Sequence, residues 1–110
     1  MTLSVGWAWV LVVVAGLLEV AWALGLKYSD GFSRLWPSVV VVVGASASFW
    51  LLAYAMRVLP AGTAYAVWVG IGAAGTALLG MVLLGEAATV GRLVCIGLIV
   101  AGVLGLKLLG

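Results

Sequence analysis

The chain has 110 residues, of which 67% are hydrophobic and only 7% are charged. A water-soluble domain of this length needs far more polar surface, so the composition excludes one and predicts an integral membrane protein. The net charge of +2 is small and dispersed along the chain, and it gives no indication of nucleic-acid binding.

Four long apolar segments follow one another along the chain, at about residues 5–26, 37–56, 63–84 and 90–109. Each is near the roughly 20 residues that a helix needs to cross about 30 Å of hydrocarbon. The apolar runs are continuous and do not alternate with polar residues, which favours helices over a β-barrel. The predicted fold is therefore an all-α membrane protein, with a single four-helix transmembrane domain over residues 1–110.

The first segment carries Glu19, the one acidic residue that lies well inside an apolar run. A carboxylate in hydrocarbon is costly, so such a residue usually has a function and faces a cavity or a partner. Apolar surroundings also favour the neutral, protonated carboxyl. A carboxyl that holds either a proton or a cation is the minimal part of a proton-coupled cation carrier; a purely structural acid is the alternative. Helical spacing places Gly16 and Trp22 on the same face as Glu19.

This first segment lacks the basic start of a signal peptide, because no Lys or Arg precedes Lys27. We therefore expect it to remain in the mature protein.

The second segment contributes the isolated hydroxyls of Ser46 and Ser48, and the third carries Tyr65, Trp68 and Gly72 along one face. If these faces converge on Glu19, the site combines a carboxylate, indoles, a phenol and a hydroxyl. That mixture suits a small planar organic cation: the carboxylate accepts two parallel N–H bonds from a guanidinium group, and the indole faces offer cation–π contacts.

Each of these side chains also has a simpler interpretation. Tyr and Trp commonly anchor a helix at the membrane surface, which is the role expected for Trp7, Trp9 and Trp36. A buried serine often bonds to its own helix, so Ser48 either does that or orients the Glu19 carboxylate. Glu86 lies between the third and fourth segments and is expected to be a solvated loop residue.

The fourth segment contains four glycines and no ionisable residue between Arg92 and Lys107. Small residues drive helix association in lipid, so we expect this helix to serve packing or dimerisation.

Basic residues divide almost evenly between the two sides of the membrane. With four spans, Lys27, Arg34 and Arg92 share one side, and Arg57 and Lys107 share the other. So weak a bias leaves the orientation poorly specified. Either a very small protein simply has few charges, or copies insert both ways and pair as an antiparallel dimer, which recreates the inverted repeats of a transporter.

Two separated motifs resemble those of the small multidrug resistance transporters. The run LEVAWA at residues 18–23, followed by GLKYSDGF at 25–32, is similar to the signature of their first helix. The run PAGTAYAVW at residues 60–68, followed by GIG at 70–72, is similar to the signature of their third helix. The similarity covers essentially the whole chain.

Trp22 distinguishes subtypes within this family. Guanidinium exporters carry Trp three residues after the essential Glu, whereas exporters of polyaromatic cations typically have Gly there. The run Gly105-Leu106-Lys107 also resembles guanidinium exporters. One departure is Val69, which stands where guanidinium exporters usually have Thr, and its effect on selectivity is open.

The resemblance implies an antiparallel, dual-topology homodimer in the cell inner membrane that exchanges protons for guanidinium or small guanidinyl cations. It assigns the dimer contact to the fourth helix. The sequence itself has no His, no phosphate loop and no cluster of metal ligands, so we expect no enzyme activity, cofactor or metal. The resemblance implies that proton and substrate compete for the Glu19 carboxyl and that Gly16 gives access to it. It places four side chains around this carboxyl: Trp22, Ser48, Tyr65 and Trp68.

Other functions stay open at this point. They are export of bulky quaternary ammonium or aromatic cations, action as one subunit of a heterodimeric transporter, an ungated channel, and a non-transporting membrane protein that associates with another complex. Trp22 argues against bulky cations, because an indole beside the acid narrows the space available.

Overall fold

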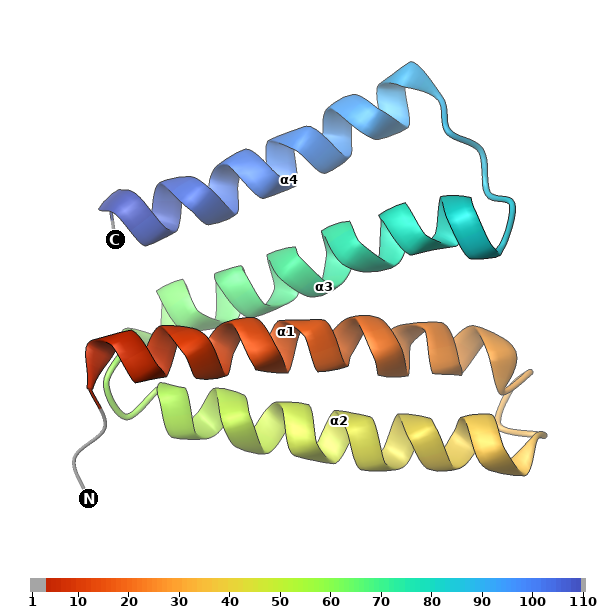
Figure 1. Cartoon of the computed structure of the whole chain (residues 1–110), viewed down its shortest axis with the longest axis horizontal. Helices are drawn as coiled ribbons and strands as arrows, with labels where there is room; N and C mark the ends of the chain where they lie inside the picture. Colours follow the sequence, from red (N-terminus) through yellow and green to blue (C-terminus); the bar gives the residue numbers. More distant parts are fainter. Residues whose placement is uncertain (1–3, 110) are drawn as a thin grey trace.

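The computed structural model describes residues 4–109, which form four helices (Figure 1). These are α1 (Val5–Tyr28), α2 (Leu35–Ala55), α3 (Ala61–Leu83) and α4 (Val90–Leu109). Each is long and apolar enough to cross a membrane. The predicted all-helical fold with four membrane-length helices is confirmed.

Hydrogen bonds from serines define both ends of α1. The Ser4 hydroxyl caps the first turn by accepting a hydrogen bond from the backbone N–H of Trp7. At the other end, the buried Ser29 hydroxyl donates to the Leu26 carbonyl and accepts from the Phe32 N–H. These bonds hold a tight connection in which three consecutive residues, 30–32, have positive φ.

The helix α2 begins at Leu35, two residues before the proline that the sequence suggests as its start. Pro37 therefore lies within the first turn, where its missing N–H removes no hydrogen bond of the helix.

The helices lie in the order α2, α1, α3, α4 across a single layer (Figure 1). The molecule is flattened, with extents of 41 × 35 × 16 Å. Among the described residues, α4 packs chiefly along α3, and its Lys107 ammonium lies 4.8 Å from the centroid of the Trp9 ring of α1. The α4 glycines at 91, 97, 102 and 105 meet no atom within 4 Å of an added methyl group. The layer has no second row of helices among the described residues, and one of its edges is largely uncovered.

Close contact between α1 and α3 depends on glycines. A methyl group added to Gly16 would lie 2.8 Å from the Cβ of Ile71, and one added to Gly75 would lie 2.5 Å from a methyl of Val20. The bare backbones let the two helices approach and bring together the faces that carry Glu19 and Trp68.

The substitution Gly75→Ala tests this packing. Val20 has one strongly preferred rotamer in a helix and cannot turn away, so the added methyl group should force the helices apart. We expect the free energy of unfolding to fall by about 1–3 kcal/mol, measured by denaturation of the purified protein in detergent. The control Gly62→Ala, whose methyl group meets nothing within 4 Å, should cause no loss. Equal losses in the two variants would contradict the close contact.

Candidate functional site

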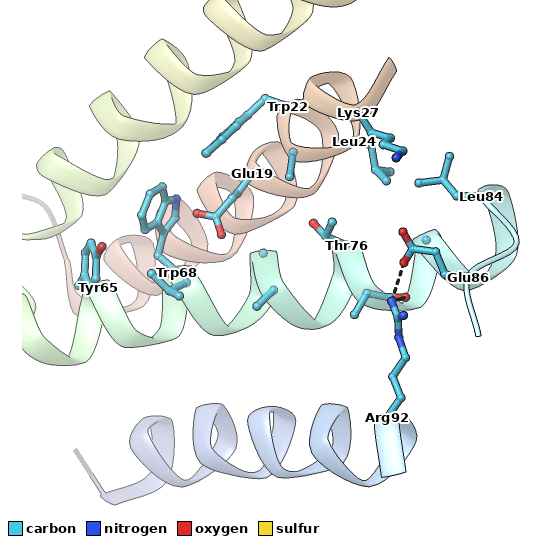
Figure 2. Close-up of a pocket in the computed structure, with 16 residues that line it drawn as sticks. Glu19, Trp22, Leu24, Lys27, Tyr65, Trp68, Thr76, Leu84, Glu86 and Arg92 are labelled. Carbon is cyan, nitrogen blue, oxygen red and sulfur yellow. Dashed lines mark hydrogen bonds and ion pairs between the residues drawn. The ribbon is translucent and has the colours of Figure 1, made fainter. Parts of the chain in front are cut away.

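A pocket of about 570 Å³ runs along the contact between α1 and α3 and continues to the first turn of α4. Figure 2 shows Glu19 projecting from α1 toward α3, with Trp22 above its carboxylate and Trp68 to the left. The principal residues that line the pocket come from α1, from α3, from the connection to α4 and from the first turn of α4: Glu19, Trp22, Lys27, Tyr65, Trp68, Val69, Gly72, Thr76, Gly80, Glu86 and Arg92.

The Glu19 carboxylate is half-buried and lies against the bare backbone of α3 at Gly72. A methyl group at Gly72 would overlap the carboxylate, so a glycine is required for this approach. Within residues 4–109 the Glu19 side chain has no ion-pair or hydrogen-bond partner. The pocket therefore holds a carboxyl group that no cation of the described chain neutralises.

A buried hydrogen-bond chain fixes the indole of Trp68. Its Nε1–H donates to the Ser48 hydroxyl at 2.8 Å, and that hydroxyl donates to the carbonyl oxygen of Ala15 at 2.7 Å. Ser48 is fully buried and Trp68 is 4% exposed. One hydroxyl from α2 thus sets the position of an α3 indole relative to α1, one turn before Glu19.

Two further aromatic rings contact the Trp68 indole: Phe49, which is not part of the pocket lining, and Tyr65, which is. Phe49 lies between the two indoles, with ring centroids 6.1 Å from Trp22 and 5.4 Å from Trp68. The Tyr65 ring is 5.6 Å from Trp68 and more than half exposed at the edge of the pocket. Phe49 directly follows Ser48, but no feature of the sequence singled it out.

Four of the six predicted site residues meet in this pocket: Glu19, Trp22, Tyr65 and Trp68. Two others lie outside it. Ser48 lies behind Trp68, and the proposed hydrogen bond to the carboxylate is replaced by the one to Ala15. Gly16 is buried in the contact with Ile71 of α3, and its predicted role in access stays a prediction.

The structure also brings groups to the pocket that sequence reasoning missed. Glu86 is an exposed residue of the connection before α4, as expected, but it also forms an ion pair with Arg92 at 2.6 Å. The hydroxyl of Thr76 and the indole N–H of Trp22 are buried and have no hydrogen-bond partner within the described chain. Buried polar groups usually have a hydrogen-bond partner, so these two atoms are exceptions in the lining of the pocket.

Four membrane-length helices and a pocket centred on an embedded carboxylate define a multi-pass membrane protein. The profile of the family described as Small Multidrug Resistance protein matches residues 7–99. The chain belongs to this family, as its two motifs indicate.

Similar proteins carry a consistent name. The guanidinium exporter of Yersinia pseudotuberculosis serotype I is 66% identical over 101 residues, which cover 92% of this chain and 97% of that protein. Guanidinium exporters of Citrobacter freundii and Salmonella typhimurium are 56% identical over 101 residues, which cover 92% of this chain and 96% of each of theirs. These names agree with the subtype that Trp22 indicates.

The substitution Ser48→Ala tests the buried chain. It leaves the Trp68 N–H buried without an acceptor, and we expect the free energy of unfolding to fall by about 1–3 kcal/mol. Ser46→Ala is the matched control, because that exposed hydroxyl bonds only to the Val42 carbonyl of its own helix. Thermal unfolding of both variants in detergent gives the comparison. A Ser48→Ala protein as stable as Ser46→Ala would disprove the stabilising role of the chain.

Proposed function

We propose that the protein exports guanidinium and small guanidinyl cations across the cell inner membrane in exchange for protons. The observation that carries this proposal is the Glu19 carboxylate, held between two indoles without a counter-ion in the described chain. The names of the 56–66% identical relatives support the choice of guanidinium.

The chemistry of the pocket suits a planar, N–H-rich cation. Two parallel hydrogen bonds from guanidinium to Glu19 satisfy both carboxylate oxygens. The rings of Trp22 and Trp68 then lie beside the cation, and they offer it cation–π attraction. Tyr65 at the edge adds a hydroxyl for a further N–H. The Ser48 hydroxyl acts indirectly, by holding the Trp68 indole in place.

Proton exchange follows from the isolation of Glu19. Guanidinium needs the ionised carboxylate, whereas a bound proton removes the negative charge that attracts the cation. Occupancy by one therefore excludes the other. A site neutralised by either cation can change the side it faces, whereas the empty, charged site is held back by the cost of moving a bare charge through hydrocarbon. Cation export then uses the inward proton gradient.

Three features support an antiparallel homodimer as the working unit. A layer one helix thick leaves the Glu19 pocket open, so a second copy is needed to enclose it. Helix α4 leaves its glycines uncovered and is suited to the dimer contact. The nearly even division of basic residues permits both orientations. Two Glu19 carboxyls would then share one chamber.

Export of bulky quaternary ammonium or aromatic cations is the second candidate. The pocket volume and the apolar Val69 in its lining favour it. The Trp22 indole opposes it, because it occupies space directly beside the acid.

The substitution Glu19→Gln tests the coupling site. It keeps the size of the side chain but can neither ionise nor pair with a cation. In proteoliposomes, we expect guanidinium-driven proton movement in the wild type and none above the empty-vesicle background in Glu19→Gln. Unchanged proton-coupled flux in the variant would refute the assignment of Glu19.

The substitution Trp22→Ala tests selectivity. Removal of the indole deletes a cation–π contact worth about 0.5–2 kcal/mol, so guanidinium flux at low concentration should fall at least about twofold. The added space should raise flux of a bulky quaternary ammonium ion. Trp7→Ala, which removes an indole 64% exposed and outside the pocket, should change neither. A Trp22→Ala protein with unaltered preference between the two cations would contradict the role of the indole.

A further inference from the structure

The pocket does not end at Glu19 but continues along α3 to a second carboxylate. Figure 2 shows Glu86 and Arg92 at the end of the pocket beyond Thr76, with a dashed line between them. The Glu86 carboxylate lies over Gly80, where an added methyl group would overlap it. A glycine in the last turns of α3 thus lets this carboxylate lie at the pocket wall, as Gly72 does for Glu19.

Glu86 already binds a guanidinium group, that of Arg92. The Arg92 Nη2 donates to Glu86 Oε1 at 2.6 Å and also approaches the Ala77 carbonyl at 3.4 Å. Within residues 4–109 no other side chain bonds to the Glu86 carboxylate. The proposed substrate has the same planar, N–H-rich chemistry as the group that Glu86 holds.

The pair is weak enough for its cation to be exchanged. The side chains of Arg92 and Glu86 are 33% and 40% exposed, and ion pairs as open as this contribute little stability. The other charged residue lining this end of the pocket is Lys27, which repels cations. Glu86 is therefore the one lining group at this end that attracts an entering cation.

We propose that Glu86 is an outer binding site for guanidinium cations, occupied by Arg92 when no substrate is present. An incoming cation displaces the Arg92 guanidinium from Glu86 and then moves past Thr76, whose buried hydroxyl has no partner among the described residues, to Glu19. This inference rests on the proposed export of guanidinium. In an antiparallel dimer, one such site would lie at each membrane face.

A purely structural role is the rival explanation, because the pair also joins the end of α3 to the start of α4. The two explanations predict different effects of removing Glu86 or Arg92 on guanidinium binding. If Arg92 competes with the substrate, removal of Glu86 should weaken binding and removal of Arg92 should strengthen it. If the ion pair is purely structural, loss of either residue breaks the same contact. The two variants should then change the guanidinium-driven flux in the same direction.

The test is guanidinium-driven proton flux in proteoliposomes as a function of guanidinium concentration, for the wild type, Glu86→Gln and Arg92→Gln. We expect Glu86→Gln to raise the half-saturating concentration about threefold, the scale set by an exposed charge pair, with the maximal flux retained. Arg92→Gln should lower it. Arg92→Lys keeps the charge but loses the planar guanidinium group, so the lysine should compete less well with the substrate. The half-saturating guanidinium concentration should therefore also fall in this variant.

The outcomes separate this site from the proposed function. Shifts in the same direction for Glu86→Gln and Arg92→Gln, or no shift in either, would overturn the outer site. If Glu86→Gln is too unstable to reconstitute, the two Arg92 variants are the test. A raised half-saturating guanidinium concentration in Arg92→Gln and in Arg92→Lys would also overturn the outer site. A wild type that moves no protons with guanidinium would refute the export function itself.

Discussion

A carboxylate without a counter-ion inside an apolar helix is the constraint on which the rest of this structure depends. Glu19 lies in a 24-residue helix, and no cation in residues 4–109 pairs with it. Such a group is costly in a membrane unless a ligand or a proton neutralises it, and the proposed exchange of one for the other at Glu19 rests on this requirement. The requirement also explains why the lining of the pocket is aromatic: indole faces attract a cation without offering a permanent counter-charge.

The surrounding structure serves to position this carboxylate. Gly72 leaves room for it against α3, and Ser48 fixes the Trp68 indole beside it through two hydrogen bonds that link α3, α2 and α1. Both contacts depend on α1 and α3 lying close together. A small change at a glycine of that interface should therefore alter the site without touching any group that contacts the substrate. At the far end, Glu86 and Arg92 present the same carboxylate–guanidinium chemistry at the surface.

Much of this could be predicted from sequence because it depends on local periodicity. Continuous apolar runs fix four helices, and three-residue spacing puts Trp22 beside Glu19 and Tyr65 beside Trp68. The remaining features depend on which helix faces contact one another in the fold. The acceptor of the Ser48 hydroxyl is 33 residues away, so spacing within α2 could not identify it. Whether Gly16 lines a pocket or packs depends on Ile71 in another helix, and the Glu86–Arg92 pair depends on the path of the connection before α4.

The central claim is that guanidinium and protons compete for Glu19. It is tested most directly by measuring guanidinium binding and proton release together, by calorimetry and with a pH indicator, on detergent-solubilised protein in weakly buffered solution. The account predicts that guanidinium acidifies the solution in proportion to the amount bound, and that Glu19→Gln neither binds the cation nor releases protons. Guanidinium that binds to the wild type without proton release, over a pH range in which the carboxyl titrates, would contradict it.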